Sequence, residues 1–177
     1  MIYVLLVDGF EEIEALEPVD IMRRAGLEVK TVGVNDKMVC GSHNIKVEAD
    51  IMIDEVDIDK MELLMLPGGP GHEIMDASND AHALINTAHA KGVYISAICA
   101  APSIIGKKGL LDGKKATCFP GFEKYLYGAE VTGEKVAHDG QFITGKGAGA
   151  AADFGFKMVE ILISKEKADE LRGVMQY

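Results

Sequence analysis

Apolar residues along the chain follow two patterns, and these patterns alternate. Short continuous apolar runs are typical of β-strands that are covered on both faces. They lie at 2–7, 27–34, 61–67 and 93–98. The stretches with apolar residues at helical spacing lie between and after them, at 11–24, about 79–91 and from about 100. Strands separated by single helices predict βαβ units, and therefore an α/β sandwich with a mainly parallel sheet.

The remaining segments extend this pattern without interrupting it. Residues 38–50 and 134–145 have strand character, and Asp139-Gly140 between apolar runs predicts a hairpin in the second segment. Residues 150–164 have helical spacing, and a final short helix is expected after them. Because no linker, repeat or low-complexity tract separates these elements, we expect one domain over residues 1–177.

Composition and charge limit the classes of function. The chain has 177 residues, 48% of them hydrophobic, which fits one domain with a sizeable core. Its net charge of −10 argues against sequence-independent binding to nucleic acid or to an anionic membrane. No apolar run approaches the roughly 20 residues that a membrane helix needs. We therefore expect neither a nucleic acid nor a membrane as a partner.

The N-terminal residues and the cysteines indicate the cellular compartment that we expect. Met1 leads directly into IYVLLVDG, without the basic leader of a signal peptide. The three cysteines, Cys40, Cys99 and Cys118, lie far apart and form no CxxC pair. This pattern fits a reducing cytoplasm better than a disulfide framework, and it carries no zinc signature.

Three loops should meet at one edge of the predicted sheet. In parallel α/β sheets, ligands bind beyond the carboxyl ends of the strands. The loops at this edge are DGFEE after the first strand, PGGPG after the 61–67 strand and CAAPS after the 93–98 strand. The third loop begins with Cys99.

Small residues flank Cys99 on both sides. Ala97 and Ala101 stand two residues before and two after it, as the small residues do in a nucleophile elbow. A helix start next to the sulfur would lower the thiol pKa, and the Ala100 N–H would face an oxyanion. The alternative is a buried cysteine that serves only packing, and the pattern alone does not separate the two.

The first helix carries a carboxylate in an unusual place. On a helical wheel, Glu14 projects between Pro18 and Ile21, whereas acidic side chains usually face solvent. In apolar surroundings near a thiolate, its pKa would be raised and it could donate a hydrogen bond. The alternative, a first-turn glutamate that only favours the helix dipole, suits Glu11 and Glu12 better.

Two glycine-rich stretches are weaker signals. Adjacent glycines in PGGPG let the backbone approach a ligand closely, but the stretch could equally be a tight turn. GKGAGAA at 145–151 follows a predicted hairpin, so it does not indicate a dinucleotide site.

Several segments together resemble one family. GFEEIEALEPVDIMRRAG, LPGGPG, AICAAPSIIG, ATCFP and ADFGFKMVEIL are similar, in content and order, to the ThiJ/PfpI superfamily. Within it, they resemble the branch of the parkinsonism-associated deglycase and the YajL-like proteins. The resemblance implies a flavodoxin-like three-layer sandwich, usually a homodimer, with no metal or organic cofactor.

The resemblance also implies site residues. It places the reactive cysteine on Cys99 and its partner carboxylate on Glu14. It assigns an anion-binding backbone pocket to Gly68, Gly69 and Ala100. Arg24 falls where the family has an arginine near its dimer interface, and His43 is a second candidate for that interface.

At two positions this chain differs from branches of the family, and these differences limit which activities are expected. The peptidase branch has a histidine after its cysteine, whereas this chain has Ala100, which argues against a cysteine peptidase. The deglycase has a histidine in the segment matching TCFP, whereas this chain has Phe119 beside Cys118. Both are candidate pocket-lining residues, together with His72, the loop histidine directly after PGGPG.

Two hypotheses of function use the same cysteine. In the first, Cys99 forms a hemithioacetal with methylglyoxal, another small reactive carbonyl or a glycated protein, in a cofactor-independent glyoxalase or deglycase reaction. In the second, the thiol is oxidised and the protein is an oxidative-stress sensor or chaperone. A role in the thiazole monophosphate (thiamine) pathway lacks a phosphate-binding motif in this sequence.

Overall fold

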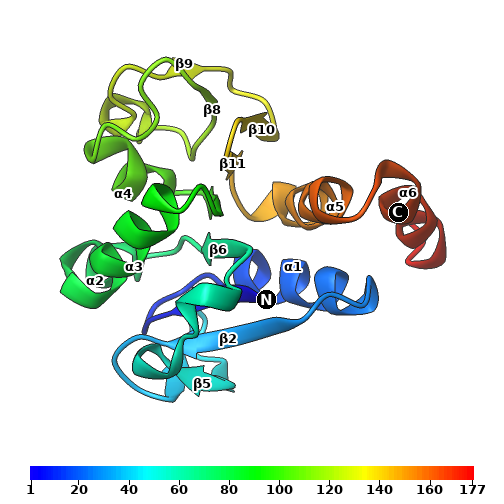
Figure 1. The fold of residues 1–177 in the computed structure, drawn as a ribbon, viewed down its shortest axis with the longest axis horizontal. Helices are drawn as coiled ribbons and strands as arrows, with labels where there is room; N and C mark the ends of the chain where they lie inside the picture. The colour runs from blue at the N-terminus through cyan, green and yellow to red at the C-terminus, as the bar shows by residue number, and fades with distance from the viewer.

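A seven-stranded sheet forms the centre of the computed structural model, which describes residues 1–177 (Figure 1). Its strand order is β10-β11-β7-β6-β1-β2-β5. All neighbouring strands are parallel except β10 and β11, which are antiparallel. The strands are β1 (Ile2–Leu6), β2 (Val29–Gly33), β5 (Ile51–Met52), β6 (Leu63–Leu66), β7 (Tyr94–Ile98), β10 (Val136–Asp139) and β11 (Phe142–Gly145).

Helices cover both faces of this sheet. Figure 1 shows the first group on one side and the second group on the other. The first group is α1 (Glu12–Arg24), α5 (Ala151–Leu162) and α6 (Lys165–Val174). The second group is α2 (His72–Ala77), α3 (Asn79–Ala90) and α4 (Pro102–Lys107). The predicted three-layer sandwich is therefore confirmed. None of these helices combines the length and the apolar character needed to cross a membrane.

The central strands explain the continuous apolar runs in the sequence. In β1, Val4 and Leu6 belong to the core cluster under α1 and α5, whereas Tyr3 and Leu5 belong to the cluster under α3 and α4. Side chains alternate between the two faces of a strand, so a strand between two helical layers needs apolar residues at every position.

The two predicted segments of strand character are also strands. Residues 134–145 contain the antiparallel pair β10–β11, with Asp139 opposite Phe142 and Gly140 in the turn at φ +60°. Residues 38–50 contain a separate hairpin, β3 (Met38–Cys40) with β4 (Lys46–Glu48). The sequence did not predict α2, the short strand β5, the small pair β8 (Lys115–Ala116) and β9 (Glu130–Val131), or the 3₁₀ helices η1 (Ile53–Glu55), η2 (Ile58–Lys60), η3 (Glu123–Tyr125) and η4 (Ala148–Ala150).

The chain changes direction across the sheet between β1 and β6. From β1 it passes through α1 to β2 on one side, and it later returns to β6 and β7 on the other. Ligands of open α/β sheets bind at such a switch point, outside the carboxyl ends of the strands. The start of α1 and the loops after β6 and β7 lie at this edge, as expected from the sequence.

Candidate active site

Cys99 occupies a sharp turn between β7 and α4. Its φ is +66°, a left-handed conformation that costs a non-glycine residue about 1–2 kcal/mol. The turn is fixed on both sides, because the Cys99 N–H donates to the Gly145 carbonyl (2.9 Å) and the Phe119 N–H donates to the Cys99 carbonyl (2.8 Å). Ala97 and Ala101 are fully buried, so larger side chains would not fit there.

Glu14 lies in α1 and is almost completely buried, with 1% of its surface exposed. Its carboxyl group contacts three donors from three different loops. The Gly68 N–H donates to Oε2 over 3.1 Å, and the Ala148 N–H and the Cys99 thiol also hydrogen-bond with the carboxyl group. The structure thus brings together Glu14 and Cys99, the two residues predicted to form a pair.

Burial decides the pKa of Glu14. Loss of hydration raises this pKa to about 7, and the negative charge of Glu11 acts in the same direction. The hydrogen bonds from Cys99, Gly68 and Ala148 partly oppose the shift, because they stabilise the carboxylate. The carboxyl group can therefore both accept and donate a proton near neutral pH.

The expectation of a lowered thiol pKa at Cys99 is wrong. The pKa of this thiol is raised to about 12, mainly by burial and next by the charge and the hydrogen bond of Glu14. The N–H groups of Gly69 and Ala100 act in the opposite direction but do not compensate. The helix expected to favour the thiolate, α4, has only six residues, so its dipole is small.

The ionisation of the Glu14 carboxyl group and that of the Cys99 thiol depend on each other. An ionised Glu14 keeps the Cys99 thiol protonated, because two negative charges in a buried site repel each other. When Glu14 takes the proton, this repulsion disappears and the neutral carboxyl group can donate a hydrogen bond to the sulfur. Protonation of Glu14 therefore removes one of the causes that keep the Cys99 thiol neutral.

The predicted anion-binding backbone needs one correction. The N–H groups of Gly69 and Ala100 lower the pKa of the Cys99 thiol, and their role in binding an anion stays a prediction. The Gly68 N–H does not act on the thiol in this way, because it already donates to Glu14. Gly69 has φ +86°, and a Cβ there would lie 2.5 Å from the Glu11 nitrogen, so this position requires glycine.

The three candidate pocket-lining residues lie in different surroundings. Phe119 lines a cavity of about 410 Å³ together with Pro120 and residues 147–150. Cys118 is buried in the core under α4, and its thiol pKa is raised to about 12, so its placement in the pocket lining is wrong. His72 lines a different cavity, of about 450 Å³, where its ring contacts Phe122 edge-on and its Nδ1 lies 2.9 Å from the Gly69 carbonyl oxygen.

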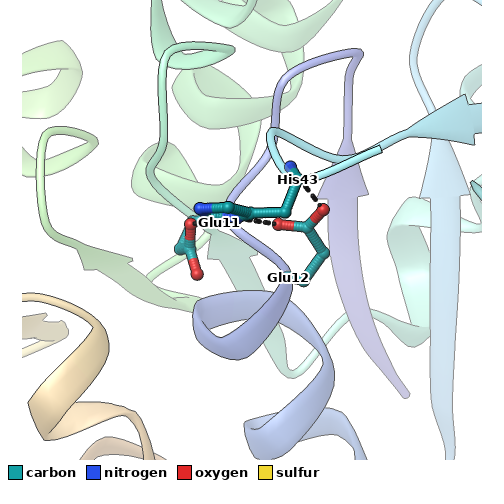
Figure 2. Close-up of side chains that lie close together, drawn as sticks. All are labelled: Glu11, Glu12 and His43. Atoms are coloured by element: carbon teal, nitrogen blue, oxygen red, sulfur yellow. Dashed lines mark hydrogen bonds and ion pairs between the residues drawn. The ribbon is translucent and has the colours of Figure 1, made fainter. Parts of the chain in front are cut away.

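His43 and the first two glutamates of the DGFEE loop form a second cluster of ionisable groups (Figure 2). His43, in the β3–β4 turn, places Nδ1 2.8 Å from Glu12 Oε2 and 3.3 Å from Glu11 Oε2. The expectation that Glu12 only favours the helix dipole is wrong, because it is 5% exposed and bonds to His43. Its Oε1 accepts the His43 N–H over 2.7 Å, so it fixes the β3–β4 turn to α1.

The same cluster is the one place where side chains could hold a metal ion. The ligand atoms of Glu11, Glu12 and His43 lie within 4.8 Å of one another. In this structure they bond to one another and to Ser42, and they require no ion to satisfy them. Arg24 is exposed and pairs with Asp20 (2.8 Å). The dimer interface expected at Arg24 and His43 stays a prediction.

Sequence reasoning missed Ala148 as a donor to Glu14. The available signal was GKGAGAA, whose small residues allow the loop after β11 to approach α1. This glycine-rich stretch was too weak a signal on its own, because Glu14 in α1, which the loop contacts, is far away in the sequence.

The fold and the site define a class of protein: an α/β sandwich with a cysteine at a strand end that is hydrogen-bonded to a buried carboxyl group. Comparison with known proteins agrees with this class. The chain belongs to the DJ-1/PfpI family, whose model matches residues 1–161.

The relatives and solved structures are similar over most of this chain. It is 35% identical to protein dj-1beta of Drosophila melanogaster over 172 residues, 95% of this chain and 92% of that protein. It is 37% identical to DJ-1 homolog B of Arabidopsis thaliana over 169 residues, 93% of this chain but 39% of that longer protein. A deglycase of Thermococcus kodakarensis is 30% identical over 150 residues, 84% of this chain and 90% of that protein. The crystal structure of a DJ-1 superfamily protein from Salmonella typhimurium has a TM-score of 0.94 and 30% identity, covering 99% and 97% of the two chains.

Proposed function

We propose that this protein is a cofactor-independent glyoxalase or deglycase that acts on methylglyoxal or on early glycation adducts through Cys99. The observation that carries the proposal is the hydrogen-bonded pair of Glu14 and Cys99 at the carboxyl ends of β1 and β7. The deglycase name of the Thermococcus kodakarensis relative is consistent with the proposal, although the name belongs to that relative.

The first step joins the sulfur to the substrate. Glu14 accepts the proton of the Cys99 thiol, and the thiolate attacks the aldehyde carbon of the dicarbonyl. A C–S bond forms, and the aldehyde π electrons move to the oxygen. The N–H groups of Gly69 and Ala100, which act on the Cys99 thiol, stabilise the oxyanion in this proposal. Glu14 then returns the proton to this oxygen, which gives a hemithioacetal.

The second step moves a proton between neighbouring carbons. The Glu14 carboxylate removes the hydrogen of the former aldehyde carbon, which gives an enediolate, and delivers it to the former ketone carbon. The hydroxyl proton on the former aldehyde carbon moves to the oxygen of the former ketone carbon as the thioester carbonyl forms. The product is a thioester of a hydroxy acid on Cys99. Water hydrolyses this thioester, so methylglyoxal and one water give lactate, with no net oxidation and no external reductant. A base with a pKa of about 7 suits this transfer at neutral pH.

This chain lacks the family's histidine, but Glu14 remains to transfer protons. Phe119 stands where the resemblance would place an imidazole, and it has no proton to transfer. Glu14 is the one titratable group hydrogen-bonded to Cys99, so it must serve both steps. We therefore expect slow turnover compared with an enzyme that has two acid–base groups.

The test is methylglyoxal consumption with lactate detection. We compare the wild type with Cys99→Ser and Glu14→Gln, and with Cys40→Ser as a thiol control outside the site. We expect both site variants to lose at least about 100-fold of kcat/KM, and Cys40→Ser to keep it. If the wild type is no faster than Cys99→Ser, the proposal is wrong, and the hypothesis of an oxidation sensor or chaperone replaces it.

A further inference from the structure

One cavity borders the Glu14 side of the candidate site. It has a volume of about 410 Å³ and is lined by Phe119, Pro120, Lys135, Lys146 and residues 147–150. A volume of this size is within the range of small-molecule pockets. Phe119 is 47% exposed, so its ring is accessible at the cavity.

The cavity wall and the catalytic pair share backbone. The Phe119 N–H donates to the Cys99 carbonyl, and the Ala148 N–H hydrogen-bonds with Glu14. A Cβ on Gly147 would lie 3.3 Å from Cδ2 of Phe119 and 3.9 Å from Oε1 of Glu14. A side chain on Gly147 would therefore contact both the aromatic ring and the carboxyl group, and glycine leaves that space free.

The surface of this cavity is mainly apolar. Phe119, Pro120 and the alanines and glycines of residues 147–150 contribute carbon atoms. Each lysine ammonium group has a protein partner: Lys135 pairs with Asp153 (3.1 Å), and Lys146 donates to the Gly133 carbonyl (3.0 Å). The lysines thus line the cavity with their stems while their charges are bound elsewhere.

We propose that this cavity holds the substituent on the ketone carbon of the substrate and that Phe119 makes the enzyme selective for α-oxoaldehydes with an aromatic substituent. This inference rests on the proposed function. The reaction steps are unchanged: phenylglyoxal and one water give mandelate, with the phenyl ring against Phe119 during proton transfer. Apolar contact and ring–ring packing stabilise this substrate, whereas glyoxal has only hydrogen at that position.

The test compares how one substitution changes two substrates. We measure kcat/KM for phenylglyoxal and for glyoxal with the wild type, Phe119→Ala and Phe119→Leu, after subtracting Cys99→Ser. We expect Phe119→Ala to lower the phenylglyoxal-to-glyoxal ratio at least about 10-fold, and Phe119→Leu to lower it less. Comparing ratios between variants cancels the intrinsic reactivity of each aldehyde. Tyr127→Ala is the matched control, because Tyr127 is an exposed aromatic residue outside the cavity lining, and its ratio should equal that of the wild type.

Binding of the two products, mandelate and lactate, tests the same selectivity without turnover. The chain has no tryptophan, so Phe119→Trp in a Cys99→Ser background provides a single tryptophan at the cavity, which can be excited selectively. We expect mandelate to change its fluorescence at a concentration at least about 10-fold lower than lactate does.

The outcomes separate this inference from the proposed function. If the wild type turns over neither aldehyde faster than Cys99→Ser, the proposed function is wrong and the inference falls with it. If it turns over both and Phe119→Ala leaves the ratio unchanged, only the inference is wrong. Equal binding of mandelate and lactate to the tryptophan variant would also overturn it.

Discussion

The Gly68 backbone N–H donates a hydrogen bond of 3.1 Å to Oε2 of Glu14, and no space remains for a side chain on Gly68. A Cβ there would lie 2.5 Å from this oxygen and 2.6 Å from the Cβ of Cys99. The loop after β6 therefore sets the distance between the acid and the thiol. Glycine is needed at this position for close approach rather than for its backbone angles.

Gly68→Ala should separate the pair. The added methyl group must displace either the carboxyl group or the cysteine, and a shift of about 1 Å in a catalytic group costs about 100-fold in rate. We expect that loss in methylglyoxal turnover, with the free energy of unfolding lowered by about 1–3 kcal/mol in urea denaturation. Gly173→Ala in α6 is the control, because nothing lies within 4 Å of its new methyl group. Wild-type turnover by Gly68→Ala would contradict the argument.

Glu14 should make the folded chain less stable as the pH rises. Its pKa is raised from 4.5 to about 7, mainly by burial, so between these values the folded chain retains a proton that the unfolded chain has released. This contribution to the free energy of unfolding is complete below about pH 4.5 and lost above about pH 7, roughly 3 kcal/mol in total.

Glu14→Gln tests this contribution, because its amide is neutral at every pH. We expect the variant to gain stability relative to the wild type between pH 5 and pH 8, as measured by urea denaturation at both values. A constant difference between the two proteins across this range would show that the carboxyl group titrates normally.

Glu14→Gln should also lower the pKa of the Cys99 thiol. Burial is the largest cause of its rise to about 12 and remains in the variant, but the charge of Glu14, the next cause, is removed. The pH dependence of alkylation reports this pKa when Cys40→Ser and Cys118→Ser are present in both proteins. A thiol pKa that stays at the wild-type value or rises would refute the coupling of the two groups.

Glu12 should stabilise the fold more than its histidine partner does. Glu12→Ala leaves the backbone N–H groups of His43 and Ile45 without their acceptor, which costs about 1–3 kcal/mol. His43→Ala keeps both of these bonds and removes only an exposed side chain, so we expect a smaller loss in urea denaturation at pH 7. Equal losses from the two variants would show that the imidazole, rather than the backbone, makes the important contact.

The same carboxylate should contribute to acid denaturation. Burial raises the pKa of Glu12, but the hydrogen bonds from His43 and Ile45 outweigh it and lower the pKa from 4.5 to about 2. Its stabilising effect is therefore present above about pH 4.5 and is lost as the pH falls towards 2. Acid titration of the wild type and Glu12→Ala should converge in this range, and parallel curves would contradict the assignment.

Local patterns predicted most elements of the fold. The strands at 2–7 and 93–98 and the helix at 11–24 follow from periodicity, because burial on two faces or one face leaves a direct pattern in the sequence. The six-residue helix α2 and the two-residue strands β5, β8 and β9 were missed, since such short elements contain too few residues to show a period.

The sequence by itself determined the layered α/β architecture and the position of Glu14 on an apolar arc, since both depend on the spacing of neighbouring residues. Only the tertiary structure decided that the Gly68 N–H is used by Glu14, that Glu12 is buried under the β3–β4 turn, and that the thiol pKa rises instead of falling. These properties depend on desolvation and on contacts between loops far apart in the chain. Both arise only when the strands align their carboxyl ends at one edge of the sheet.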